Sequence, residues 1–224
     1  MNDPRGSMWR LWDLHYHTPS SYDVADTITN EDIVDELLGR NIAAVAITDH
    51  HVMDVQRIKE LQVIAGDRLT IFPGIEFRSE LGGRSSVHFI GIFSPDSDLD
   101  HIRTTLQGKL SITSKDIIDK GGNDSIYVDF QEGCGIIHDL GGIVSVHAGK
   151  KSNSIERISH ASEYQRAVKV DIVRKCIDIF EAKDKEDAED YRNIIFPNIK
   201  MERPIIVASD THHSANDAER VPCW

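Results

Sequence analysis

Cysteine is scarce in this sequence: its 224 residues include only Cys134, Cys176 and Cys223, which are far apart and form no C-x-x-C pair. This scarcity argues against a disulfide framework and against a cysteine-type zinc finger, and it favours a reducing, cytoplasmic location. Long apolar runs are also missing, because none approaches the roughly 18 residues that a membrane span requires. We therefore expect no membrane partner, and the polar amino terminus does not resemble a secretory signal.

Basic residues are outnumbered, since 25 Lys and Arg face 37 Asp and Glu and give a formal charge of −12. Such a chain is a poor non-specific binder of nucleic acid, because neutralising phosphates requires Lys and Arg. A local basic pocket remains compatible with this charge, and bound divalent cations would offset part of it. Three common catalytic signatures are absent as well: G-x-S-x-G, the Walker-type phosphate loop and G-x-G-x-x-G.

Hydrophobic residues make up 40% of the chain, which is enough for a core. Apolar runs predict seven strands, at 9–14, 42–48, 69–76, 87–93, 143–146, 177–181 and 204–209. Helical patterns cover 30–39 (capped by Asn30), 54–65, parts of 97–141, 161–175 and 183–192. Strands that alternate with helices predict one α/β domain built on a parallel sheet, either open or closed into a barrel.

Histidines and acidic residues fall at the ends of these predicted strands. In chain order they are His15, His17, Asp49, His50, Glu76, His88, His147, Asp210 and His212. The carboxyl ends of parallel strands meet on one face of such a fold, where active sites gather. His88 is the exception because it begins its strand, so either that boundary or that strand's direction departs from the pattern.

Imidazoles and carboxylates together are ligands that suit Zn²⁺, Mn²⁺ or Fe²⁺. Residues two apart in a strand point the same way, so His15 and His17 can hold one metal, and Glu76 can bridge two. Two or three metals would activate a water molecule and bind the oxygens of a phosphate ester. Taken alone, a His-x-His pair need not bind metal, and Asp49 could simply cap the helix that follows it. However, six of the 11 histidines fall at strand ends, and this joint pattern favours a metal site.

The ordered motifs resemble those of the PHP domain, the polymerase and histidinol phosphatase superfamily. The matching segments are His15-x-His17-Thr18, Thr48-Asp49-His50, Pro73-Gly74-x-Glu76, His88, His147 and Ser209-Asp210-x-His212. This resemblance extends over residues 9–213. It implies a distorted (β/α)7 barrel, similar to a TIM barrel, with a di- or trinuclear metal site. It also implies hydrolysis of phosphate esters, which range from histidinol phosphate to nucleotides and nucleic-acid ends.

The resemblance also implies three sets of metal ligands. These are His15, His17, Glu76 and Asp210; Glu76, His88 and His147; and Asp23, His50 and His212. Asp49 is implied to orient a ligand without binding metal itself. We expect Glu76, His147 and Asp210 to be the catalytic residues.

Four basic residues lie close to these motifs and are candidates for binding a substrate phosphate. They are Lys150 and Lys151 after His147, Arg78 after Glu76, and Arg84 before His88. A solvated surface charge is an equally good interpretation of each. The absence of a basic stripe favours nucleotides or single-stranded DNA or RNA ends over duplex substrates.

The sequence therefore predicts a metal-dependent phosphoesterase (a phosphatase, phosphodiesterase or nuclease) that uses a metal-activated hydroxide. The alternative is a catalytically weak PHP module that regulates, or binds partners for, a larger ATPase or polymerase. Candidates for all nine ligand positions count against that alternative. The motif around His15 also resembles PHP domains that precede AAA- or SMC-type ATPases, which implies an ATPase domain beyond Trp224. Arg5-Gly6-Ser7 resembles a vector remnant, so we expect a tag at 1–7 and a single domain at 8–224.

Overall fold

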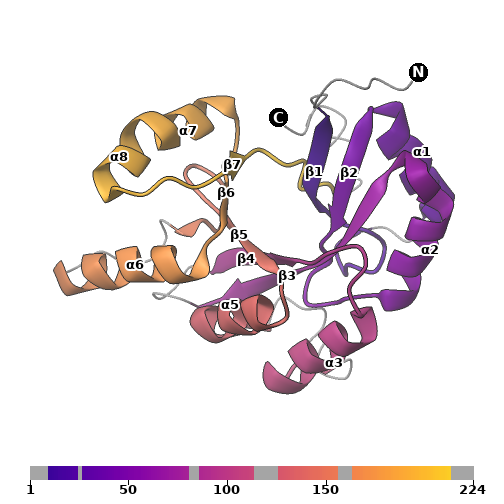
Figure 1. Ribbon diagram of the computed structural model, residues 1–224, viewed down its shortest axis with the longest axis horizontal. Helices are drawn as coiled ribbons and strands as arrows, with labels where there is room; N and C mark the ends of the chain where they lie inside the picture. Colours follow the sequence, from indigo (N-terminus) through magenta and orange to yellow (C-terminus); the bar gives the residue numbers. More distant parts are fainter. Residues whose placement is uncertain (1–9, 25–26, 81–85, 114–125, 156–162, 213–224) are drawn as a thin grey trace.

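The computed structural model describes residues 10–24, 27–80, 86–113, 126–155 and 163–212. Its seven strands form one curled sheet in the order β1 to β7, as expected for a half-open (β/α)7 barrel (Figure 1). The strands are β1 (Leu11–Tyr16), β2 (Ile42–Ile47), β3 (Thr70–Ser79), β4 (Val87–Ile92), β5 (Ile143–His147), β6 (Ile179–Glu181) and β7 (Ile205–Ile206). The predicted number of strands is confirmed.

One strand breaks the parallel pattern. β4 pairs antiparallel with both β3 and β5, whereas all other neighbouring strands are parallel. The parallel sheet expected from the sequence therefore has one exception, and the departure anticipated at His88 is in the direction of its strand. Only residues 80–86 separate β3 from β4, and a parallel crossover needs a dozen residues or more, so the chain has to turn back on itself. The reversal brings His88, at the start of β4, to the edge where the parallel strands end.

The helices lie around the outer face of the sheet (Figure 1). They are α1 (Asn30–Gly39), α2 (Val55–Ala65), α3 (Leu99–Lys109), α5 (Phe130–Asp139), α6 (Glu163–Cys176), α7 (Lys185–Asp190) and α8 (Phe196–Ile199), with a 3₁₀ turn η1 (Gly66–Arg68) and a π turn η4 (Tyr191–Ile195). The range predicted for α1 is confirmed, but its cap is Thr29. The Thr29 hydroxyl accepts from the Asp32 N–H, and the Asp32 carboxylate accepts in return from the Thr29 N–H.

The two faces of the sheet have different cores. The outer face packs against the helices through a large apolar cluster that includes Val45, Phe77 and Phe89. The inner face has a much smaller cluster of Leu14, Ala46, Ile90, Ile92 and Ile179. This inner cluster leaves the carboxyl-end half of the barrel interior to polar side chains.

A β-bulge in β1 sets which of its side chains point inward. Asp13 pairs with Val45 and Tyr16 with Ile47, so β1 has one more residue than β2 over this stretch. Leu14 belongs to the inner apolar cluster, and the next residue, His15, also points inward to the polar half. Bulges of this kind redirect side chains and are frequent beside active sites.

The end of the last strand closes the curled sheet against β1. β7 is shorter than the predicted strand at 204–209, yet the residues that follow it bond to β1. The Asp210 N–H donates to the His15 carbonyl at 3.0 Å, and the His17 N–H donates to the Thr211 carbonyl at 3.2 Å. The buried Asp13 carboxylate accepts from the Ser209 N–H at 3.1 Å. Among the described residues, no helix has the length and apolar character that a membrane crossing needs.

Two glycines of α5 differ in the space around them and provide a test of the outer core. A Cβ on Gly133 would meet the Phe89 ring at 2.8 Å, whereas a Cβ on the exposed Gly135 would meet nothing within 4 Å. We expect Gly133→Ala to lower the free energy of unfolding by about 1–3 kcal/mol through overpacking. Gly135→Ala should raise it by about 0.5–1 kcal/mol, because Ala favours the helix. Urea denaturation measures both, and equal effects would contradict this packing.

Candidate metal centre

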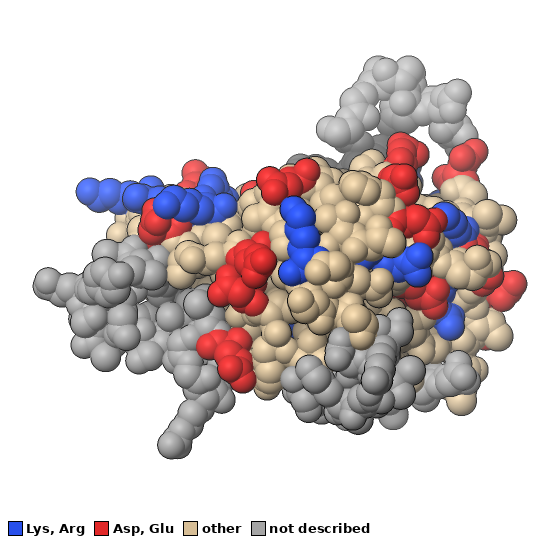
Figure 2. All heavy atoms as spheres, turned by 90° about the horizontal axis from the view of Figure 1, so that it is seen from below, with Lys and Arg blue, Asp and Glu red and all other residues tan. Residues whose placement is uncertain are grey.

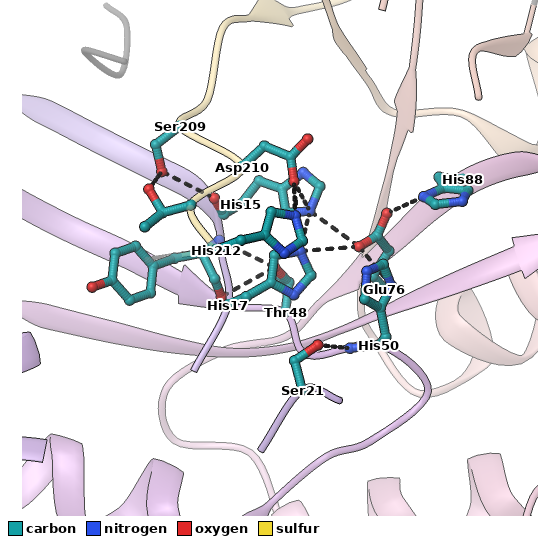
Figure 3. A network of polar contacts seen from close by, with 12 residues as sticks. His15, His17, Ser21, Thr48, His50, Glu76, His88, Ser209, Asp210 and His212 are labelled. Atoms are coloured by element: carbon teal, nitrogen blue, oxygen red, sulfur yellow. Dashed lines mark hydrogen bonds and ion pairs between the residues drawn. The ribbon is translucent and has the colours of Figure 1, made fainter. Parts of the chain in front are cut away.

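The nine side chains predicted as ligands meet in one cluster at the edge of the sheet where the parallel strands end. Figure 3 shows seven of them: His15, His17, His50, Glu76, His88, Asp210 and His212. Six of them are buried: His15, His17, His50, Glu76, His88 and His147. Asp23, Asp210 and His212 keep partly exposed side chains, at 28%, 18% and 29%. The cluster is therefore reached from solvent on the side of these three residues.

Glu76, near the middle of β3, lies at the centre of the cluster. Its Oε2 is 3.2 Å from the Nε2 atoms of both His15 and His17 and 3.1 Å from Nδ1 of His50. Its Oε1 is 2.6 Å from Nδ1 of His88 and 3.7 Å from Nε2 of His147. The two oxygens thus face two different sets of histidines, which is the arrangement of a carboxylate that bridges two metal ions.

The first corner of the cluster has the size of a metal site. Nε2 of His15 and Nε2 of His17 are 2.9 Å apart, and Asp210 Oδ1 lies 3.4 and 3.6 Å from them. A tetrahedral ion with bonds of 2.0–2.1 Å separates its ligand atoms by about 3.4 Å. Together with Glu76, the ligand atoms of this corner match that spacing. His15, His17 and Asp210 have ligand atoms within 4.8 Å of one another and could hold one divalent ion together.

A second corner lies between β4 and β5. The His147 Nδ1 atom lies 3.0 Å from the Ser152 carbonyl, to which it donates as N–H, so Nε2 is left with a lone pair directed at the cluster. The Nε2 atom of His88 contacts Asn153 at 3.1 Å, which leaves Nδ1 toward Glu76. Each imidazole thus has one nitrogen held by the protein and one directed inward, as is usual for histidine ligands.

The third corner is the more exposed one. Asp23 Oδ2 lies 3.3 Å from His50 Nε2 and 3.1 Å from His212 Nδ1. His17 stacks on both rings, with centroids at 4.6 Å from His50 and 4.4 Å from His212. The segment after β1 therefore brings Asp23 close to the ends of β2 and β7, and these groups could hold a further ion.

The carboxylates of the cluster are ionised. Burial would raise the pKa of Glu76, but His50, His15 and His88 hold it well below its ordinary value. Burial likewise opposes the ionisation of Asp210, yet His15 and Lys151 keep its pKa well below the usual range. These carboxylates therefore carry the negative charge that divalent cations require.

The histidines respond to the same electrostatics in different ways. Burial and the nearby Lys151 ammonium lower the pKa of His147 to about 3, so this ring is neutral and has a free lone pair. Burial would lower the pKa of His212, but Asp210 and Asp23 raise it to about 9. His212 is therefore protonated at neutral pH until a cation takes the place of its proton.

Two buried groups in the cluster were missed by the sequence analysis as ligand-supporting residues. Glu181, the last residue of β6, directs both oxygens at Nδ1 of His15, at 3.1 and 3.0 Å. Glu181 also pairs with the Lys151 ammonium, which lies 3.1 Å from Asp210 Oδ2 as well. The same rule that selected Glu76 and Asp210, an acidic residue at a strand end, also applies to Glu181 and could have found it.

Asp49 holds the backbone that follows β1. Its carboxylate accepts from the Thr18 N–H at 2.7 Å and from the Thr18 hydroxyl at 2.8 Å. Burial raises its pKa to about 6, although the nearby His17 and the bonds to Thr18 oppose the shift. Asp49 thus contacts the segment that leads to Asp23, in keeping with an orienting role.

The candidate phosphate-binding residues lie in different surroundings. Arg78 donates from Nη2 to the Tyr22 hydroxyl at 2.7 Å, and the Tyr22 ring centroid is 5.5 Å from that of His50, so this pair lies beside the cluster. Lys150 instead directs its ammonium at α7, 3.7 Å from Asp190. Lys151 is inside the cluster. Arg84 lies outside the described residues.

No family model and no curated protein matches the sequence. Solved structures do match its fold. A candidate metal-dependent phosphoesterase from Bifidobacterium adolescentis superposes with a TM-score of 0.60 at 15% identity, over 95% of this chain and 92% of that one. An amidohydrolase from Chromobacterium violaceum, solved with sulfate and without metal, has a TM-score of 0.58 at 16% identity, over 92% and 89%.

A lesion-specific endonuclease from Pyrococcus furiosus also matches, with a TM-score of 0.59 at 15% identity. The match covers 91% of this chain but only 48% of that longer protein. At these identities the likeness concerns the fold. The chain therefore has the barrel-like fold of this phosphoesterase, this amidohydrolase and this endonuclease.

Two adjacent lysines allow a test of the charge pairing in the cluster. Lys151 is buried between Glu181 and Asp210, whereas Lys150 is exposed and, within the described part of the chain, forms its ion pairs with Glu186 and Asp190 of α7. Removing one partner of a buried ion pair costs about 3–5 kcal/mol, so we expect Lys151→Met to destabilise the metal-free protein by about 3 kcal/mol. Lys150→Met should change the stability by less than about 0.5 kcal/mol. Similar urea midpoints for the two variants would contradict the pairing.

Proposed function

We propose that the chain is a metal-dependent phosphoesterase of the PHP superfamily that holds two or three divalent transition metals. The observation that carries this proposal is the division of the Glu76 oxygens between two sets of buried histidines. A structural zinc site would be a closed, single-ion site, usually with cysteine ligands. A carboxylate shared by several imidazole sets instead suits a polynuclear centre, which is typical of phosphoester hydrolysis.

When bound, such ions lower the pKa of a water molecule and offset the charge of a phosphate group. The residues of the chain provide the surroundings for that chemistry. His15, His17, Glu76 and Asp210 would hold one ion, His88 and His147 a second one with Glu76, and Asp23, His50 and His212 a third. The buried carboxylates keep the centre anionic, and the exposed side near Asp23 and His212 admits the substrate.

The substrate class we propose is a nucleotide or an end of single-stranded DNA or RNA. On the face seen in Figure 2, the acidic and basic side chains of the described residues are interspersed and form no continuous basic stripe. With a formal charge of −12, the chain is poorly suited to gripping long duplexes through their phosphates. Endonuclease Q, which has a similar fold, was solved with a 27-mer duplex containing an abasic lesion at its active site, so duplex DNA belongs among the substrates to be tested.

A catalytically weak module that regulates an ATPase or polymerase is the alternative. A module that has lost its activity should lack several of the metal ligands. Here candidates for all nine ligand positions are present and in contact with one another, which favours the enzyme.

The proposal is tested by activity and metal content. We expect the purified chain to bind more than one equivalent of Mn²⁺ or Zn²⁺ and to hydrolyse at least one of p-nitrophenyl phosphate, its bis-ester, nucleotides or labelled single strands. Glu76→Gln should lower kcat/KM by at least about 100-fold, because it removes the charge shared by both ligand sets. The exposed carboxylate Glu60 on α2 provides the control variant Glu60→Gln. Absence of bound metal and of hydrolysis on metal addition would reject the enzyme.

Arg78 is the phosphate-binding candidate whose position we favour. A charge-assisted hydrogen bond contributes about 1.5–3 kcal/mol, so Arg78→Gln should raise KM for the best substrate by about tenfold or more, with a smaller change in kcat. Lys150→Gln should leave KM within about twofold, because its ammonium faces α7. A rise in KM for Lys150→Gln alone would place the phosphate on the α7 side of the cluster instead.

A further inference from the structure

We infer that Glu181 is a positioning residue of the metal centre, which fixes the His15 ring, and that Lys151 anchors Glu181 and Asp210 in turn. The inference rests on the proposed function, because it concerns how the chain orients ligands toward metal. The sequence suggested no role for Glu181, and it suggested phosphate binding for Lys151.

The geometry around His15 carries the first half of the inference. Glu181 is completely buried, and both of its oxygens lie 3.0–3.1 Å from Nδ1 of His15. A histidine that binds metal is neutral, and in the neutral ring a proton on Nδ1 donated to this carboxylate leaves Nε2 with a lone pair. Nε2 is the atom that faces Glu76 and Asp210, so Glu181 selects the tautomer and the ring orientation that a metal ligand needs.

Backbone pairing makes this contact rigid. Glu181 pairs with His147 across β5 and β6, and its carbonyl accepts from the Ala148 N–H at 2.9 Å. The carboxylate therefore projects from a hydrogen-bonded strand end, and a rigid element of this kind holds a ligand more precisely than a loop does.

Lys151 carries the second half. A buried carboxylate is costly unless it is paired, and Lys151 provides the countercharge at Glu181 Oε1. The same ammonium lies 3.1 Å from Asp210 Oδ2, which leaves Asp210 Oδ1 toward His15, His17 and His212. Lys151 thus holds the outer oxygen of a ligand carboxylate while the inner oxygen stays available.

A direct ligand role for Glu181 is less consistent with its position. Among the described residues, four groups of three His, Cys, Asp or Glu have ligand atoms within 4.8 Å of one another, and Glu181 belongs to none of them. Its closest histidine nitrogen is the outward Nδ1 of His15, and His147 Nε2 is farther away at 3.8 Å. Glu181 therefore acts through His15.

The test is metal binding by the whole 224-residue chain, measured by calorimetric titration with Mn²⁺ after bound metal has been removed. Outer partners of metal ligands typically contribute 10–100-fold to affinity, so Glu181→Gln should weaken the tightest binding step by that factor. The control is Asp187→Asn, which changes another buried carboxylate, one that accepts from the Lys150 and Lys183 N–H groups and touches no ligand. Its Mn²⁺ affinity should stay within about twofold of the wild type.

A second readout separates positioning from general stability. In the Zn²⁺-loaded protein, ¹⁵N-resolved NMR should place a strongly hydrogen-bonded proton on Nδ1 of His15, and Glu181→Gln should shift that signal upfield. Unchanged Mn²⁺ affinity in Glu181→Gln, or equal losses in the two variants, would overturn the inference and leave the phosphoesterase proposal standing. A wild-type chain that binds no Mn²⁺ would overturn both.

Discussion

The Glu76 carboxylate is the constraint on which the arrangement of the site depends. It is buried among histidines that come from β1, the end of β2, β4 and β5, so its charge has to be balanced by all of them together. A buried charge without partners costs several kcal/mol, and histidine rings packed this closely without a cation leave nitrogens facing one another, such as the Nε2 atoms of His15 and His17 at 2.9 Å. The strand ends are thus held where their side chains satisfy one another, and a divalent ion, as proposed, would complete that balance of charge.

Outside this centre, the fold separates stability from chemistry. The large apolar cluster lies between the sheet and its helices, and the small one fills only part of the barrel interior. Residues such as Val45 and Phe77 stabilise the strands, while their neighbours on the inner face are free to be polar. The antiparallel strand β4 also serves the site, because its direction brings His88 to the edge where the parallel strands end.

Most of this architecture could be predicted from the sequence because it follows from local patterns. Apolar runs gave the number of strands, and α1 had the expected ends. The direction of β4 was left open at His88 because strand periodicity is the same in both directions, although the short link after β3 contained the information that decides it. The cap of α1 was assigned one residue too late, since Thr29 and Asn30 are both good caps and only the fold decides between them.

The site residues that could be predicted are those whose residue type and position at a strand end already point to metal binding. Histidines at strand ends are unusual, and all nine candidates do meet. Glu181 was missed because a single glutamate at the end of a short strand looks like a surface charge until its neighbours across the sheet are known. The role of Lys151 could not be predicted from the sequence either, because its surroundings suggested contact with substrate. A lysine beside a glycine resembles a phosphate contact, and only the positions of Glu181 and Asp210 reveal its ion pairs.

The bulge in β1 has a consequence for how the protein can change over evolution. Within one strand, Leu14 faces hydrocarbon and His15 faces the ligand cluster, although they are consecutive. The border between the two environments is thus a single peptide unit. The lower barrel can accept new apolar side chains without altering the spacing of the ligands above it, and the ligands can change without opening a void below. A deletion of one residue at the bulge would instead exchange the two environments at once, so substitutions are tolerated here far better than changes in length.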